Sequence, residues 1–140
     1  MSTQKVTDPV IEAVSSSVLT GALPVLDGSA LTGVTGFVNT TNSCNFFIVK
    51  NNEVWTSTGD YCMNGITRMK VIELCKSNNI KVFEKNFSLV DVYSAHESFI
   101  TGTLGSLTQV ISIDGRSIGS NNDWPITKIL RAEYKKLLDV

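Results

Sequence analysis

The chain has 140 residues, of which 42% are hydrophobic and 18% charged, and its 12 Lys and Arg side chains nearly balance 13 Asp and Glu. This composition is typical of a globular protein, and it excludes the strong basic field with which proteins attract nucleic acid or an anionic membrane. The length predicts one domain, which buries roughly two-thirds of the surface of its unfolded chain and needs no metal or disulfide to fold.

The N-terminal residues 1–35 show no clear hydrophobic period, because Ser, Thr and Gly are scattered among aliphatic side chains. They predict at most a short helix near residues 9–18. From Gly36 onward the pattern is tighter, and residues 36–140 form the well-patterned part of the chain. Two strands are predicted at FFIVK and EVWTS, and the Asn-Asn pair between them is typical of a tight β-hairpin turn with positive φ angles.

The next elements alternate between helices and strands. A helix is predicted from about Thr67 to Lys76, where apolar residues recur at helical spacing. A strand follows at IKVFEKNF, then a short helix that Ser88 and Asp91 would cap, and then a strand at ESFITG. The chain ends with a strand pair around an Asp-Gly turn and an amphipathic helix at WPITKILRAEYKKLL.

The longest apolar run is four residues, far too short to span a bilayer, and the opening MSTQKVTDPV has no apolar core of a signal peptide. We therefore expect a soluble cytoplasmic protein with neither a membrane nor a nucleic-acid partner. The three cysteines form no CxxC pair and cannot all pair with one another, which predicts reduced thiols and no metal site. These residues are Cys44, Cys62 and Cys75.

Two stretches have the composition of anion-binding turns. In NGITR, Gly65 allows a sharp turn, and the free amides of Ile66 and Thr67 would meet the Thr67 hydroxyl at the positive end of the predicted helix. In ITGTLGS, a glycine between two threonines follows a predicted strand and could present further N–H donors as a nest. Two such turns that face one cleft would hold a phosphate, although each alone is more often an ordinary cap or turn.

The order of the sequence blocks resembles that of the class IV, or fold-type IV, pyridoxal-phosphate-dependent aminotransferases. This family includes branched-chain and D-amino acid aminotransferases and aminodeoxychorismate lyase. The resemblance runs from Gly36 to about Leu138 and rests on the blocks GFVNTTNSCNFF, EVWTS, NGITRMKVIELC, IKVFEKNFSLVDVY, SAHESFITGT, VISIDGRSIG and PITKIL. It implies an α/β (α+β) fold, the large domain of the family, with a mixed barrel-like sheet and flanking helices.

The resemblance also implies pyridoxal 5'-phosphate as the cofactor. Its phosphate would be held at the turn formed by Gly65, Ile66 and Thr67 and by Thr103, and the amides at Thr103 and Leu104 would help to grip the substrate carboxylate. Thr40 takes the position that faces the pyridine nitrogen, where relatives usually have a glutamate. Asn45 lies in the same cofactor-facing segment. Its side chain would brace this segment through hydrogen bonds to the backbone, or Asn45 would be an ordinary turn residue.

By family spacing, Lys5 is the lysine that would form the Schiff base with the cofactor and act as the catalytic residue. The implied reaction is transamination between an amino acid of branched-chain or D type and a 2-oxo acid, in a homodimer. The smaller domain that closes over the site in relatives has no counterpart here, which predicts a truncated or single-domain form. Two alternatives stay open: a lyase that resembles aminodeoxychorismate lyase, and a non-catalytic domain that binds the cofactor or a phosphate.

Overall fold

The computed structural model describes residues 10–11, 36–41, 43–103, 105–119 and 123–139. Its centre is a six-stranded sheet of order β1-β6-β5-β2-β3-β4, in which parallel and antiparallel pairs are mixed. The strands are β1 (Val10–Ile11), β2 (Asn45–Lys50), β3 (Glu53–Thr56), β4 (Lys81–Glu84), β5 (Glu97–Gly102) and β6 (Ser106–Val110). A separate ribbon consists of β7 (Ser112–Ile113) and β8 (Arg116–Ser117), and the helices are α2 (Ile66–Ser77), α3 (Leu89–Tyr93) and α4 (Pro125–Leu138).

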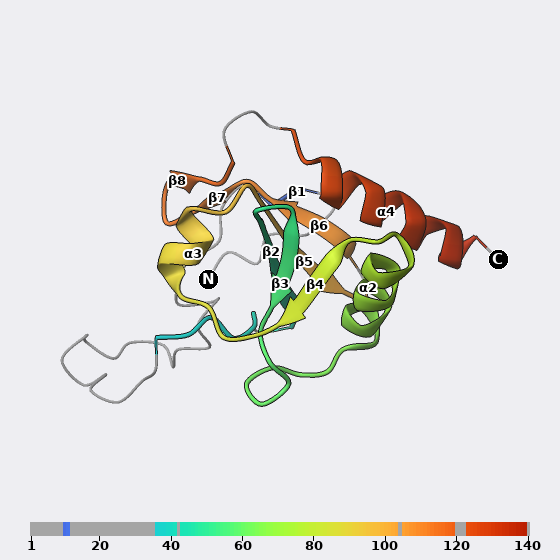
Figure 1. The fold of residues 1–140 in the computed structure, drawn as a ribbon, viewed down its shortest axis with the longest axis horizontal. Helices are drawn as coiled ribbons and strands as arrows, with labels where there is room; N and C mark the ends of the chain where they lie inside the picture. Colours follow the sequence, from blue (N-terminus) through green and yellow to red (C-terminus); the bar gives the residue numbers. More distant parts are fainter. Residues whose placement is uncertain (1–9, 12–35, 42, 104, 120–122, 140) are drawn as a thin grey trace.

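This arrangement confirms the predicted mixed sheet with flanking helices. Helices α2 and α4 lie on one side of the sheet, while α3 and the β7–β8 ribbon lie on the other (Figure 1). Within the described ranges, β1 and β4 each pair on one side only, so the sheet has two edges and the barrel-like closure is not formed. None of the helices in these ranges has both the length and the apolar character needed to cross a bilayer.

The β2–β3 hairpin has the turn that its sequence predicts. Asn51 and Asn52 adopt φ angles of 54° and 60°, and Lys50 pairs with Glu53 across the turn. Successive β2 side chains then point to opposite faces, which places them in two separate cores. Phe46 and Ile48 pack on the α3 side, whereas Phe47 and Val49 pack on the side of α2 and α4.

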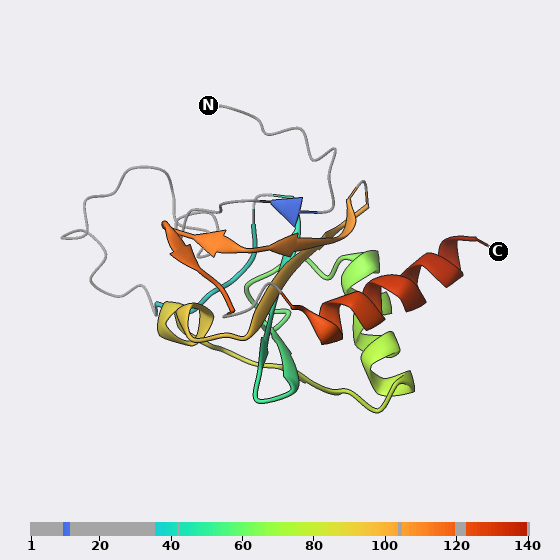
Figure 2. The ribbon, with the colours of Figure 1, turned by 90° about the horizontal axis from the view of Figure 1, so that it is seen from above.

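Helices α2 and α4 lie against each other at one end of the molecule, well separated from α3 (Figure 2). Beneath them Phe47 of β2 stacks on Phe99 of β5, with ring centroids 4.9 Å apart. The buried carboxylate of Glu97, at the start of β5, accepts hydrogen bonds from the backbone N–H groups of Ile126 (3.0 Å) and Thr127 (2.7 Å). This negative charge at the positive end of α4 fixes that helix to the sheet.

Short polar contacts fix the boundaries of α2 and α3. The α2 helix starts one residue earlier and ends one later than expected, and the Asn78 side chain donates to the Leu74 carbonyl (2.8 Å) at its end. Before α3, the Ser88 amide donates to the Asp91 carboxylate (3.0 Å), as the predicted capping pair requires. The Lys50 ammonium, 2.8 Å from that carboxylate, and the Ser88 amide together lower the pKa of Asp91 to about 2.

One expectation for the N-terminal residues is wrong where the structure describes them. Val10 and Ile11, which fall in the predicted short helix of residues 9–18, form strand β1 and pair in parallel with Gln109 and Val110 of β6. The β6 edge offers unpaired backbone groups, and pairing with it satisfies them at a place where local helical preference is weak. The other residues of 1–35, and with them the proposed division at residue 35, lie outside the described residues.

Candidate functional site

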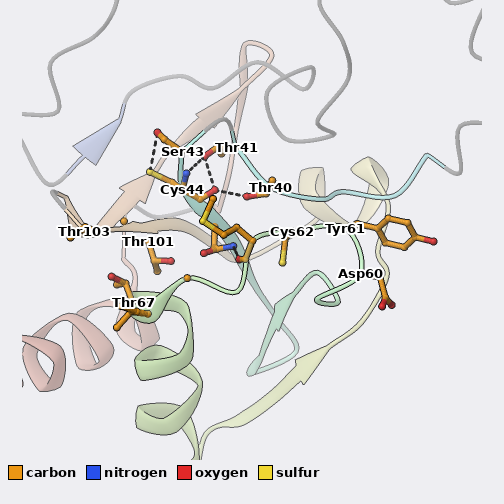
Figure 3. Close-up of a pocket in the computed structure, with 15 residues that line it drawn as sticks. Thr40, Thr41, Ser43, Cys44, Asp60, Tyr61, Cys62, Thr67, Thr101 and Thr103 are labelled. Atoms are coloured by element: carbon orange, nitrogen blue, oxygen red, sulfur yellow. Dashed lines mark hydrogen bonds between the residues drawn. The ribbon is translucent and has the colours of Figure 1, made fainter.

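A cavity of about 500 Å³ opens where β2 begins and β5 ends, beside the first turn of α2 (Figure 3). Its volume falls within the range of roughly 300–1,000 Å³ that small-molecule sites occupy. Three segments that lie far apart in the sequence form its walls: residues 40–41 with 43–45, residues 60–67 and residues 101–103. Most of the lining side chains carry hydroxyl, thiol or amide groups, and Tyr61 and Asp60 point outward, away from the other labelled residues.

The structure brings together most of the site residues predicted from the sequence. Six of them line this one cavity: Thr40, Asn45, Gly65, Ile66, Thr67 and Thr103. Lys5 and Leu104 lie outside the described residues. The threonine-glycine stretch differs in one respect from its predicted form, because Thr101 and Gly102 still belong to strand β5 and only Thr103 lies in the turn after it.

The first turn of α2 lines the cavity, and its amides have no partner within the helix. The first hydrogen bond along the helix runs from the Met69 amide to the Gly65 carbonyl (3.0 Å), so the amides of Ile66, Thr67 and Arg68 precede the regular pattern. The residue before the helix is Gly65, which has no side chain to cap them. In a 12-residue helix these amides and the macrodipole favour an anionic group at this end. A phosphate therefore fits this wall of the cavity.

Close packing between Asn45 and Gly65 positions that helix end. The Asn45 amide nitrogen donates to the Met63 carbonyl (2.7 Å), which ties the start of β2 to the loop before α2. A Cβ atom added to Gly65 would lie only 2.6 Å from the Asn45 amide oxygen, so a larger residue at position 65 would force the Asn45 side chain to move. The sequence left Asn45 either as a brace of its own segment or as an ordinary turn residue; in the structure its side chain braces the neighbouring loop.

Arg68 holds the same loop from the other side. Its side chain is only 2% exposed and donates to the Ser57 carbonyl (2.8 Å), the Glu84 carboxylate (2.6 Å) and the Asn64 side chain (3.0 Å). These contacts span the loop that runs from β3 to α2. The guanidinium is not among the groups that line the cavity, so its positive charge orders the loop and does not meet a ligand directly.

The Thr40 hydroxyl donates to a carbonyl group that also accepts hydrogen bonds from two other donors. It donates to the Cys44 carbonyl (2.6 Å), which also accepts from the Thr41 hydroxyl (2.7 Å) and the Thr41 amide (2.9 Å). A carbonyl oxygen has two lone pairs, so the two Thr41 groups satisfy it without Thr40. The Thr40 hydroxyl can therefore turn toward a ligand without leaving a buried acceptor unpaired.

Two of the three cysteines, Cys44 and Cys62, line the cavity and are partly exposed. The third, Cys75, belongs to α2 and faces the core, where burial raises the pKa of its thiol to about 12. Thiols react as thiolates, so Cys75 is inert in the folded protein while the cavity thiols are within reach of reagents.

Comparisons with known proteins agree with this geometry. The family model described as amino-transferase class IV matches residues 27–113. A branched-chain-amino-acid aminotransferase-like protein 2 of Arabidopsis thaliana is 42% identical over 81% of this chain, which spans 20% of that protein. The fold resembles that of a branched-chain amino acid aminotransferase of Escherichia coli, with a TM-score of 0.70 and 32% identity over 73% of this chain and 35% of that one. It also resembles an aminotransferase of Brucella abortus bound to the cofactor PLP, with a TM-score of 0.69 and 31% identity over 75% of this chain and 37% of that one.

The contact between Gly65 and Asn45 predicts a specific mutational effect. Gly65→Ala should destabilise the protein by about 1–3 kcal/mol in denaturant unfolding, because the new methyl group overlaps the Asn45 side chain. In an Asn45→Ala background the same substitution should cost clearly less, since the obstructing atom is gone. If the two substitutions have additive effects, the Asn45 side chain is not what requires glycine at position 65.

Proposed function

The chain belongs to the class IV aminotransferase family, and on this basis we propose that it forms the large-domain part of a pyridoxal-phosphate-dependent aminotransferase. It would transfer an amino group between an amino acid of branched-chain or D type and a 2-oxo acid. The observation that most supports this proposal is the convergence of three distant segments on one cavity. The chain spans about a fifth to a third of the length of the relatives it matches, so the activity of a whole aminotransferase is part of the proposal.

In this proposal the cofactor phosphate binds at the first turn of α2. The amides of Ile66 and Thr67 donate to it, Gly65 lets it approach the backbone, and the Thr103 hydroxyl closes the site from the end of β5. Asp60 is the only Asp, Glu, Lys or Arg among the described lining residues, and it is exposed. The phosphate charge is therefore met by helix amides and hydroxyl groups on these walls.

Thr40 is proposed to meet the pyridine nitrogen of the cofactor. Its hydroxyl, released from the Cys44 carbonyl, would donate a hydrogen bond to an unprotonated nitrogen. When bound, the cofactor withdraws electrons from the α-carbon of the amino acid, which lowers the cost of removing a proton there. A neutral hydroxyl makes this withdrawal weaker than the carboxylate usual in the family, because it does not stabilise a positive charge on the ring.

Lys5 is proposed as the group that attaches to the cofactor and moves the proton at the substrate α-carbon. The family spacing to Thr40 supports this assignment. We also propose a homodimer, which the same resemblance implies, and a cytoplasmic location, which rests on the sequence pattern. A second candidate function is cofactor or phosphate binding without transfer. The described cavity lining favours it, since these residues include no amine that could attach to the cofactor.

Binding of the cofactor in this cavity can be measured through the alkylation rates of the cavity cysteines. Saturating pyridoxal 5'-phosphate should slow alkylation of Cys44 and Cys62 by at least several-fold, because both thiols line the cavity. Cys75 should stay unmodified with and without ligand until the protein is unfolded, which provides an internal control. Peptide mass spectrometry measures all three sites at once. Equal rates with and without ligand would contradict binding at this site.

Covalent attachment separates the two candidate functions. After incubation with pyridoxal 5'-phosphate and reduction with borohydride, the aminotransferase proposal expects a stable adduct on Lys5 that is lost in Lys5→Arg. Cysteine protection without an adduct on any lysine would favour cofactor binding alone. Release of pyruvate without an oxo-acid acceptor would instead favour the lyase alternative.

The proposed position of Thr40 predicts an electrostatic effect. Thr40→Glu should raise the pKa of the bound cofactor's pyridine nitrogen by about 1–3 units, because a carboxylate within about 4–6 Å stabilises the protonated ring. Thr40→Gln has nearly the same size without the charge and should leave that pKa close to the wild-type value. Nitrogen NMR of labelled, bound cofactor gives the titration. Equal pKa values in the two variants would show that residue 40 does not face the nitrogen.

A further inference from the structure

The hydroxyl of Thr101 is buried without a partner. Its side chain is 1% exposed, and its Oγ1 atom has no hydrogen bond within the described part of the chain. Buried hydroxyl groups are nearly always bonded, since an unpaired one costs free energy that folding does not recover. Thr101 also lines the cavity, and Figure 3 shows it on the same side as Thr67 of α2. The unpaired hydroxyl thus belongs to a residue of the cavity wall.

The sheet register fixes the direction of this side chain. Thr101 pairs directly with Asn45 across β5 and β2, two positions beyond the stacked pair Phe99 and Phe47. Side chains two residues apart lie on the same face of a strand, so Thr101 and Asn45 share the face that α2 covers. The Asn45 side chain in turn touches Gly65 at the start of that helix. Thr101, Asn45 and Gly65 therefore lie next to one another in a row from β5 to the start of α2.

We propose that Thr101 is a further binding residue of this cavity, and that its hydroxyl donates to the anionic phosphoryl group held at the first turn of α2. This inference rests on the proposed function, because it adds one donor to the same phosphate site. The phosphoryl oxygens accept several hydrogen bonds each, and the amides of Ile66 and Thr67 occupy only part of that capacity. The hydroxyl rotates freely and can reach an acceptor whose position the backbone has already fixed.

The Thr67 hydroxyl is compatible with the same arrangement. It accepts a long hydrogen bond of 3.5 Å from the Tyr134 hydroxyl and keeps its own proton for a ligand. Thr67 and Thr101 would then donate from α2 and from β5, two different walls of the cavity. An ordered water could also bond to Thr101, but a water would leave ligand affinity independent of the threonine hydroxyl. Affinity measurements distinguish the two cases.

The experiment compares two valine substitutions in the full chain. Thr101→Val keeps the shape of the side chain and removes the hydroxyl. Thr58→Val is the matched control, because the Thr58 hydroxyl is likewise buried without a partner but does not line the cavity. Both variants should raise the melting temperature of the ligand-free protein by about 2–4 °C, since each removes an unpaired buried polar atom.

The two variants should differ in ligand affinity. For pyridoxamine 5'-phosphate, calorimetry should give a dissociation constant about tenfold higher in Thr101→Val than in wild type, or about 1.4 kcal/mol. Thr58→Val should bind like wild type, and Thr101→Ser, which keeps the hydroxyl, should recover most of the affinity. For pyridoxamine, which has no phosphate, wild type and Thr101→Val should bind equally weakly.

The outcomes separate this inference from the proposed function. If wild type binds pyridoxamine 5'-phosphate and Thr101→Val binds it equally well, the role of Thr101 is wrong and the proposed function stands. If Thr101→Val loses affinity equally for both probes, the hydroxyl does not contact the phosphate and the inference is again wrong. If wild type binds neither probe, the proposed function and this inference both fail.

Discussion

The close contact between Asn45 and the backbone at Met63 and Gly65 is the constraint on which the candidate site depends. It joins the first residue of β2 to the loop before α2, so the start of that helix has a fixed position at the edge of the sheet. Arg68 secures the same loop to the ends of β3 and β4. With both contacts in place, the first residues of the helix form part of the cavity wall.

Local chemistry made much of the fold predictable from the sequence. The Asn51-Asn52 pair specifies its turn through positive φ angles, and Ser88 with Asp91 specifies a helix start. The family resemblance identified six of the fifteen residues that line the cavity. What sequence could not reveal depends on long-range contacts: the strand pairing of Val10 and Ile11, and the burial of Arg68 against Glu84. Thr101 stands out in the sequence only as part of a turn, and the register with Asn45 shows on which face of the sheet its side chain lies.

The described lining of the cavity offers an anion dipoles and no cationic side chain. Among its described lining residues the only Asp, Glu, Lys or Arg is acidic and lies at the exposed rim. The buried cation of Arg68 donates from its two terminal nitrogens to carbonyl, amide and carboxylate partners. Oriented amides and hydroxyl groups lose less hydration free energy than a free cation when water is removed. They also need no rearrangement when a ligand binds. Thr40, on the opposite wall, likewise offers a neutral hydroxyl group and no charge.

The sheet order also determines when the cavity can appear during folding. The β2–β3 hairpin closes over two residues and forms on a timescale of microseconds. The β2–β5 pair, which sets Asn45 opposite Thr101, requires closure of a loop that contains β3, α2, β4 and α3. Such non-local pairing is slow, because the entropy of loop closure is lost before the contacts form. Ligand binding at this cavity therefore reports completion of the central sheet, and it would serve as a late probe of refolding.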